Sequence, residues 1–424
     1  MLDISSGIQK QERNMLIRKT GLALILIIIL LTQPVYSAFA EPQTTGQAVI
    51  LMDSKSGKII YARNETTALQ PASTTKILTA IIALEGCKLT DIVKATKSPS
   101  LVEPSSIGLK EGESISMENL LYALLVKSAN DAAVAIAEHI SGSAPQFAEL
   151  MNKRAKELGA ANTNFVNPNG LPDPNHYTTA HDLALFAKHA MGNADFRRFV
   201  STKYKSIPRA DDTAIKWLQN HNKILYRYDG ANGIKTGYTK EAKQCLVASA
   251  AKGNQEFIAV VLGAVGTNVW TDAQNMLDYG FANFDTFKQK DANTAVKTVS
   301  VKKGVKSVAL VTEKDFFYTM PKGKTGNVSE HVSIDDNITA PTRKGQVLGQ
   351  LNFLLSGKDL GSVNLIAQED VPVKKDMMKN VIPSMDPFLA GVVIAGLFVA
   401  WTARKRRNRL KRKKRLLFGR DVIR

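Results

Sequence analysis

The chain has 424 residues, of which 44% are apolar and 22% are charged, an ordinary composition for a globular protein with room for two folded domains and further segments. Its formal net charge is +18, but residues 404–424 carry a net +11 and residues 1–40 a net +2, which leaves +5 for residues 41–403. Because the charge is concentrated in the tail, it does not indicate a nucleic-acid-binding surface on the body of the protein.

An uncharged stretch lies near the N-terminus, at residues 20–40. Two basic residues precede it, its centre is almost entirely aliphatic, and the sequence Ala-Phe-Ala ends it. This pattern is typical of a secretory signal, so we expect residues 1–40 to be removed and the mature chain to start at Glu41. An uncleaved anchor is the alternative. Met15 is the expected start of translation, because it gives a signal of more usual length.

Residues 41–287 are predicted to form an α/β domain of the α+β type, with an antiparallel sheet flanked by helices. Two strand-like runs within 47–64 are joined by S-K-S-G and indicate a β-hairpin. The helix expected at 73–85 is apolar on nearly every side, so it belongs in the middle of the domain. The apolar, β-branched runs at 245–251 and 256–265 are expected to be central strands. Further helices are expected at 117–126, 131–140, 144–158, 179–191 and 271–284.

The pattern changes towards the C-terminus. Residues 292–372 contain short strand-like runs separated by turn signals, which predict a small all-β domain. Residues 373–386 contain Pro and Lys and are expected to be a linker.

A second uncharged run, PFLAGVVIAGLFVAWTA, occupies residues 387–403. Its 17 residues would span about 26 Å as a helix, near the lower limit for crossing a bilayer. The basic tail at 404–424 follows at once and is expected in the cytoplasm, whereas the export signal places the folded domains outside. We therefore predict a single-pass bacterial membrane protein whose tail also attracts anionic lipids. Binding of nucleic acid by the tail is the less favoured alternative.

Three short polar motifs follow one another along the chain: S-T-T-K at 73–76, S-A-N at 128–130 and K-T-G at 235–237. Ser73 opens the apolar helix, so Lys76 lies one turn later on the same face and points back towards it. The second motif interrupts two helices and the third leads into an apolar strand. In this order the motifs are the signature of serine acyl-transferases that bind penicillin.

Each motif has further matches, and their context argues against them. Ser249 and Ser300 begin other SxxK matches, Ser362 begins an SxN match, and Lys324 begins a second K-T-G. Ser249 lies within an expected strand, where the residue three places later does not come round to it. The matches in the all-β domain also occur in a different order, so we interpret them as coincidental.

The first set of motifs predicts nucleophilic catalysis. A serine hydroxyl needs a base before it can attack an amide, and Lys76 is the only cation in the same helical turn as Ser73. Lys76 must be neutral to act as a base, and burial among apolar residues lowers a lysine pKa. The N-terminus of the helix also directs backbone N–H groups towards a reacting carbonyl.

Longer segments resemble the low-molecular-weight penicillin-binding proteins, the serine D-alanyl-D-alanine carboxypeptidases. Matching segments include VILMDSKSGKIIYARN, PASTTKILTA, KSANDAAVAIAEHI and DGANGIKTGYTKEAKQCLVASA, and the resemblance covers residues 45–370. It implies the penicillin-binding transpeptidase/β-lactamase-like fold, an outer β domain, a peptidoglycan stem-peptide substrate and acylation by β-lactam antibiotics. No cofactor is expected. Relatives commonly carry Ala-Gly after the K-T-G turn, where this chain has Ala242 and Lys243.

The resemblance also implies roles for the motif residues. Ser73 would carry the acyl ester, and its backbone N–H would form an oxyanion hole with that of Tyr238. Ser128 would relay a proton to the leaving D-alanine, and Asn130 would orient the substrate amide. The remaining motif residues would bind the terminal carboxylate and allow close approach of the backbone: Lys235, Thr236 and Gly237.

Other functions remain open on the same scaffold. A class A β-lactamase needs a Glu to activate water, and residues 160–190 contain none. A DD-endopeptidase that cuts cross-links is a nearer alternative, and a catalytically silent wall-binding protein a more distant one.

Several other polar residues are expected to be structural. Asp182 is interpreted as a capping or buried acid, and His176 and His221 as structural or surface residues that border the cleft only as an alternative. Cys87 and Cys245 are interpreted as small buried residues, although they could pair. No CxxC motif or Cys/His cluster in the sequence indicates a metal site.

Overall fold

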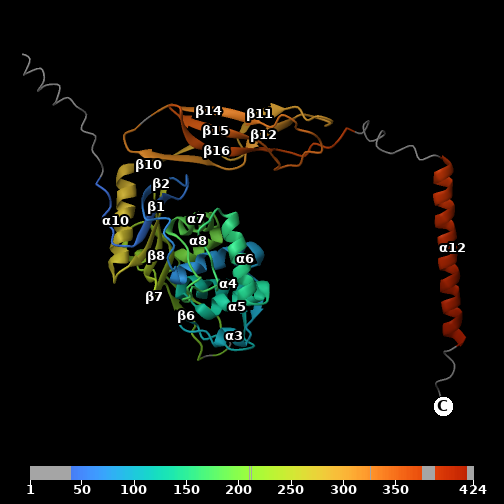
Figure 1. The fold of residues 1–424 in the computed structure, drawn as a ribbon. Helices are drawn as coiled ribbons and strands as arrows, with labels where there is room; N and C mark the ends of the chain where they lie inside the picture. The colour runs from blue at the N-terminus through green and yellow to red at the C-terminus, as the bar shows by residue number, and fades with distance from the viewer. Residues whose placement is uncertain (1–39, 210, 212, 325, 375–386, 418–424) are drawn as a thin grey trace, which may run out of the picture. The chain divides into compact units, whose positions relative to one another are not determined.

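The computed structural model describes residues 40–209, 211, 213–324, 326–374 and 387–417 (Figure 1). The chain forms two compact units that meet in sequence at Asp285 and Thr286. The predicted secretory signal falls almost wholly outside the described residues, as does most of the predicted linker. Both stay predictions.

An antiparallel five-stranded sheet organises the first unit, in the order β2-β1-β9-β8-β7. The N-terminal hairpin adds to the late strands because β1 pairs with β9 along its whole length, from Ala48 opposite Leu262 to Asp53 opposite Phe257. The strands are β1 (Ala48–Asp53), β2 (Ile59–Arg63), β7 (Ala231–Thr239), β8 (Lys243–Lys252) and β9 (Gln255–Ala264). The predicted hairpin and central strands are confirmed.

The central strands are apolar throughout because both faces of the sheet are covered. Along β9, Ile258 and Val260 face one apolar cluster, shared with the large helical layer. The alternate residues Phe257 and Ala259 face a second cluster, shared with α10. Period-two alternation between two cores explains why the sequence of β9 reads as an unbroken apolar run.

The helical layer forms largely as predicted, and α2 lies in its middle, with every residue from Lys76 to Ala83 buried. The expected helix at 117–126 instead ends early and continues as a π-turn (Ala123–Lys127). The helices are α2 (Lys76–Gly86), α3 (Lys97–Ser100), α4 (Met117–Tyr122), α5 (Asn130–Ser141), α6 (Ala144–Glu157), α7 (Ala180–Met191), α8 (Ala194–Ser201), α9 (Ile224–Arg227) and α10 (Asn268–Asn283). Two small strand pairs complete the unit: β3 (Ile92–Lys94) with β4 (Ser114–Ser116), and β5 (Tyr204–Ser206) with β6 (Trp217–Gln219).

The second unit contains the predicted all-β domain. Its main sheet has the order β11-β12-β16-β15-β14, and β10 pairs separately with β13. The stacked rings of Phe316 and Phe353, with centroids 3.9 Å apart, lie in its apolar core. The strands are β10 (Phe284–Lys290), β11 (Ala295–Val299), β12 (Val308–Thr312), β13 (Phe316–Pro321), β14 (Val328–Ile334), β15 (Val347–Leu355) and β16 (Lys358–Ala367).

The second apolar run lies in α12 (Pro387–Leu417), a helix of 31 residues. Basic residues begin at Arg404, so the uncharged part is confined to the first 17 residues of the helix. Among the residues that the structure describes, no helix is both long and apolar enough to cross a membrane. The structure therefore does not support the predicted crossing helix at 387–403.

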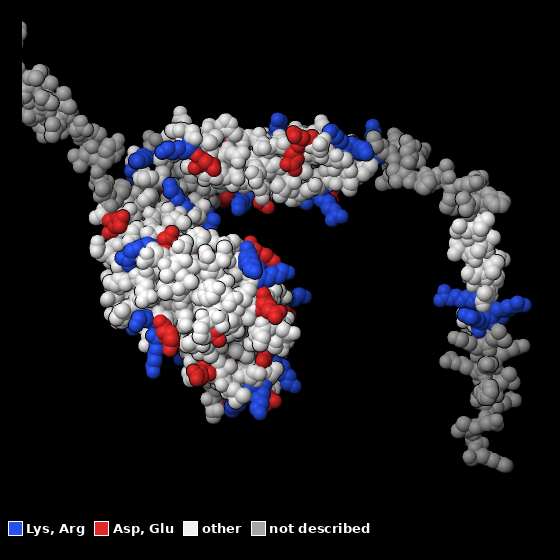
Figure 2. Space-filling model, in the orientation of Figure 1, with Lys and Arg blue, Asp and Glu red and all other residues white. Residues whose placement is uncertain are grey.

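Charge is distributed as the sequence predicted. Figure 2 shows Lys and Arg interspersed with Asp and Glu over the visible face of the first unit, whereas basic side chains gather on α12. The two cysteines, Cys87 and Cys245, are both free.

Candidate active site

A cleft of about 500 Å³ brings the three motifs of the first set together. They come from distant parts of the chain: the turn before α2, the turn before α5, and strand β7. Residues 73, 128, 130, 236, 237 and 238 all line the cleft. The side chains of Lys76 and Lys235 are buried beside it.

Ser73 lies in a short 3-10 turn (Ala72–Thr75) that leads directly into α2. The Nζ atom of Lys76 is 2.8 Å from Ser73 Oγ, 2.7 Å from Asn130 Oδ1 and 2.6 Å from the carbonyl oxygen of Asn169. Asn130 Nδ2 donates to the carbonyl oxygen of Glu103 at 2.9 Å, which directs its Oδ1 towards Lys76. The predicted geometry of Ser73 and Lys76 is thus confirmed.

The surroundings of Lys76 favour the neutral amine. Burial holds its pKa well below the ordinary value of 10.5, the positive charge of Lys235 lowers it further, and the Asp131 carboxylate acts in the opposite direction. A neutral amine has two hydrogens and one lone pair. Two of its three neighbours are carbonyl oxygens, which only accept, so the lone pair is left facing the Ser73 hydroxyl. This arrangement can take a proton from Ser73.

The carbonyl of Asn169 is a partner that sequence reasoning missed. Asn167 Oδ1 accepts from the N–H of Gly170 at 2.7 Å, and Asn167 Nδ2 donates to the carbonyl oxygen of Leu171 at 3.0 Å. Gly170 has φ +86°, and a Cβ there would lie 1.9 Å from the carbonyl oxygen of Ala72. The turn can therefore approach the Ser73 helix only with glycine at this position. The cluster of turn residues in the sequence was the available signal.

Ser128 lines the cleft, and its hydroxyl contacts the buried side chain of Lys235. Ser128 ends the π-turn with a left-handed backbone (φ 65°), a sparsely populated conformation for serine. Lys235 Nζ donates to Ser128 Oγ and to the carbonyl oxygen of Thr236, both at 2.9 Å. Burial lowers the pKa of Lys235 to about 7. Since Ser128 Oγ accepts from Lys235, its own hydrogen is free to point elsewhere in the cleft.

Gly237 lets strand β7 pass directly against the turn that carries Ser73. A Cβ at this position would lie 2.9 Å from both the carbonyl oxygen of Pro71 and the backbone nitrogen of Ser73. Any other residue would push the strand away from the nucleophile. The next residue, Tyr238, lines the cleft with an exposed side chain.

His176 contacts Thr75, a residue of the turn that carries Ser73. It is buried, and its Nδ1 accepts from the N–H of Val166 at 3.2 Å. Nε2 therefore carries the hydrogen and donates to Thr75 Oγ1 at 2.8 Å. Burial lowers the pKa of His176 to about 4.

Two other residues were expected to be structural or surface residues, His221 and Asp182. His221 lines the cleft. Asp182 is buried in α7 and accepts from the Thr163 hydroxyl at 2.7 Å, so its structural interpretation is confirmed.

We expect His176 to make the enzyme acid-sensitive. The unfolded chain takes up a proton near pH 6.5, whereas the folded chain stays neutral at His176 until about pH 4, so stability falls as the pH falls between these values. At about 1.4 kcal/mol per pKa unit, the loss is about 3 kcal/mol. Urea unfolding between pH 6.5 and 4 should show that the free energy of unfolding falls more steeply with decreasing pH for the wild type than for His176→Gln. The exposed His331 provides the control His331→Gln; equal slopes for wild type and His176→Gln would contradict the prediction.

The coincidental motif matches stay apart from this constellation. Ser249 is buried in β8, where its hydroxyl donates to Asn232 Oδ1 at 2.6 Å, and Lys252 three residues later is exposed. Ser300, Lys324 and Ser362 belong to the second unit. Lys243 occupies the strand entry with φ 58°, a conformation that favours glycine.

The fold and the cleft together define a serine acylating enzyme with a buried lysine one helical turn from the serine. The chain belongs to the D-alanyl-D-alanine carboxypeptidase family, which it matches over residues 36–266. Residues 284–373 match the C-terminal domain of penicillin-binding protein 5. The family resemblance expected from the sequence is confirmed.

Curated relatives and solved structures agree with this assignment. The chain is 38% identical over 378 residues to the D-alanyl-D-alanine carboxypeptidase DacF of Bacillus subtilis, covering 85% of this chain and 95% of the relative. It is also 38% identical over 346 residues to the D-alanyl-D-alanine carboxypeptidase DacA of Haemophilus influenzae, covering 78% of this chain and 86% of the relative. The structure of penicillin binding protein 5 from Haemophilus influenzae superposes with a TM-score of 0.64 at 35% identity, covering 78% of this chain and 99% of that one.

Proposed function

We propose that the chain removes the terminal D-alanine from peptidoglycan stem pentapeptides as a serine-type D-alanyl-D-alanine carboxypeptidase. One observation carries the proposal: the buried amine of Lys76 lies 2.8 Å from Ser73 Oγ, with its other two partners both carbonyl oxygens. A lysine held in this way serves as a base rather than as a charge.

In the proposed reaction, Ser73 Oγ attacks the carbonyl carbon of the penultimate D-alanine while Lys76 takes the hydroxyl proton. The backbone N–H groups of Ser73 and Tyr238 bind the oxyanion. Ser128 passes the proton taken up by Lys76 on to the departing amine, the C–N bond breaks, and terminal D-alanine leaves. Water then cleaves the ester and restores the Ser73 hydroxyl.

Substrate binding is assigned to Lys235, Thr236 and Asn130. Lys235 uses two of its three N–H bonds on Ser128 and Thr236, so the third can bind the terminal carboxylate together with the Thr236 hydroxyl. Asn130 lines the cleft beside Ser73 and would orient the substrate amide. Lys235 and Thr236 come from the K-T-G motif, and Asn130 comes from the S-A-N motif.

The test is product analysis with the full chain and a stem pentapeptide ending in D-Ala-D-Ala. We expect one free D-alanine per peptide and an intact cross-linked dimer. Cleavage of the cross-linked dimer instead would identify a DD-endopeptidase. If neither product forms, the proposed activity is wrong.

Penicillin gives a second readout of the same site. It should acylate Ser73 and leave slowly, since residues 160–190 supply no Glu of the kind that class A β-lactamases use to activate water. Mass spectrometry of the intact protein should find one penicilloyl group, mapped to the peptide that contains Ser73. Rapid turnover of a chromogenic β-lactam would identify a β-lactamase.

We further propose that the enzyme works outside the cytoplasmic membrane and that α12 binds lipid. The predicted signal supports export. On α12, the exposed apolar side chains of Leu397, Phe398 and Trp401 precede a run of basic residues. Each Lys or Arg near anionic headgroups contributes about 1 kcal/mol to the free energy of membrane binding. The full chain should co-sediment with phosphatidylglycerol vesicles, less so at high salt; a chain that stays in the supernatant at low salt would contradict lipid binding.

A further inference from the structure

A second group of reactive side chains lies at the ends of α2 and α5 that are remote from the cleft. Cys87 follows the last residue of α2, Asp91 lies in the loop beyond it, and His139 lies in the last turn of α5. One ligand atom from each residue lies within 4.8 Å of the other two. We propose that Cys87, Asp91 and His139 form a zinc-binding site.

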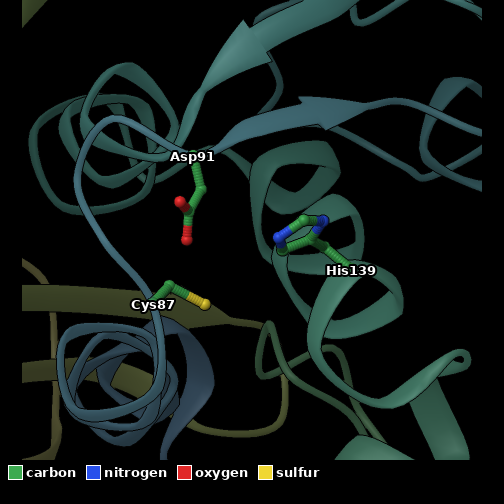
Figure 3. A group of neighbouring side chains, drawn as sticks. All are labelled: Cys87, Asp91 and His139. Carbon is green, nitrogen blue, oxygen red and sulfur yellow. The ribbon is translucent and has the colours of Figure 1, made fainter.

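The geometry requires only small side-chain adjustments. Figure 3 shows the Cys87 sulfur, the Asp91 carboxylate and the His139 ring converging on one space between the two helices. Zinc binds sulfur at about 2.3 Å and nitrogen or oxygen at about 2.0–2.2 Å, which places tetrahedral ligand atoms roughly 3.3–3.7 Å apart. Cys87 and Asp91 are half-buried and His139 is exposed, so the side chains can rotate and an ion can enter.

The donor set selects the metal. A thiolate with an imidazole and one carboxylate suits Zn²⁺ and disfavours Mg²⁺ and Ca²⁺, which prefer oxygen. Three protein ligands leave the fourth tetrahedral position to water. The C-termini of α2 and α5 also direct their partial negative charge to this place, which favours a cation.

The surrounding backbone holds one ligand in place. Asp91 Oδ2 accepts from the backbone N–H of Lys88 at 2.8 Å, and the backbone N–H of Met117 donates to the Asp91 carbonyl at 2.8 Å. Asp91 Oδ1 is left available for a metal. Among the described residues, no hydrogen bond involves the His139 ring. Backbone support of this kind is typical of metal ligands.

Bound zinc would join the two helices that carry catalytic groups at their other ends. Lys76 begins α2 and Asn130 begins α5, and their side chains are already hydrogen-bonded at 2.7 Å. A metal bridge between Cys87 and His139 would link the opposite ends. Since zinc then binds the folded chain in preference to the unfolded one, it raises the unfolding temperature.

Cobalt(II) provides a direct test, because a bound thiolate gives it a characteristic charge-transfer absorption. The full chain, free of metal and without a histidine tag, should take up Co²⁺ stoichiometrically with that absorption, and Zn²⁺ should displace it. Cys87→Ser should abolish the absorption, and His139→Ala and Asp91→Asn should each weaken binding at least about tenfold. The control His331→Ala removes another exposed histidine and should change nothing. Failure of the wild type to bind, or equal binding by Cys87→Ser, would overturn the proposal.

A second readout does not depend on the spectroscopic probe. Zinc should raise the unfolding temperature of the wild type in proportion to the logarithm of its concentration, and it should leave that of Cys87→Ser unchanged. An equal shift in both proteins would place the zinc elsewhere. Neither measurement uses D-alanine release, so the outcome is independent of the proposed enzymatic activity.

Discussion

Ser73→Ala is expected to abolish both D-alanine release and covalent labelling by penicillin. Ser73 Oγ lies 2.8 Å from Lys76 Nζ, whose other two partners are oxygens that only accept, whereas the Ser128 hydroxyl accepts from the buried amine of Lys235. Removal of a serine nucleophile elsewhere costs about 10⁶ in kcat, because the remaining groups cannot form the acyl intermediate. The readouts are D-alanine release from a pentapeptide and the mass of the intact protein after penicillin.

The control for this variant is Ser300→Ala. Ser300 begins the SxxK match of the second unit and is exposed, so its replacement should leave both activities at wild-type levels. Thermal unfolding of Ser73→Ala should show an intact fold, because alanine keeps the helix and removes only a hydroxyl. A Ser73→Ala protein that still forms a penicilloyl ester would refute the assignment of the nucleophile.

Lys76→Met is expected to slow acylation of Ser73 by about 10²–10⁴, the range that a general base contributes. Methionine preserves most of the buried volume but supplies no lone pair of comparable basicity. The loss of the amine also leaves Asn130 Oδ1 and the Asn169 carbonyl without a donor, which costs about 1–3 kcal/mol for each group. Stopped-flow acylation by penicillin should therefore be measured together with the free energy of unfolding.

The pH dependence of acylation tests whether Lys76 acts as the neutral amine. Its pKa is lowered chiefly by burial, so the wild-type acylation rate should rise with pH as Lys76 loses its proton well below pH 10.5. Lys303→Met is the matched control, since Lys303 is the exposed lysine of the Ser300 motif. Two results would contradict the proposal that Lys76 is the base: a Lys76→Met variant that is acylated at the wild-type rate, or a wild-type acylation rate that falls as Lys76 deprotonates.

The two buried lysines of the site differ in their partners. The contacts of Lys76 all lie within the protein, and two of them can only accept. Lys235 has two internal acceptors, which leaves one N–H of its charged form without a partner within the described protein. A substrate carboxylate would complete the partners of Lys235 and favour its charged form, and that charge lowers the pKa of Lys76. Binding of substrate and the neutral state of the base thus support each other.

Much of the architecture follows from local patterns. The apolar run after Ser73 predicted a central helix, and α2 is indeed buried through its first eight residues. The late apolar runs predicted central strands, and β8 and β9 fill that place. The crossing helix was not supported, because the run of 17 uncharged residues ends where the basic half of α12 begins. The run at 387–403 is uncharged, as the sequence shows, but its 17 residues are near the lower limit for a helix that crosses a bilayer.

By itself the sequence determined the candidate nucleophile, the candidate base and the order of the motifs, because residues three apart on a helix share a face in any environment. Only the tertiary structure decided that the Asn169 carbonyl completes the surroundings of Lys76, that Gly170 and Gly237 permit close approach to the Ser73 turn, and that His176 supports Thr75. It also brought Cys87, Asp91 and His139 together. Contacts between residues far apart in the chain depend on how helices and strands pack, and no local periodicity encodes that packing.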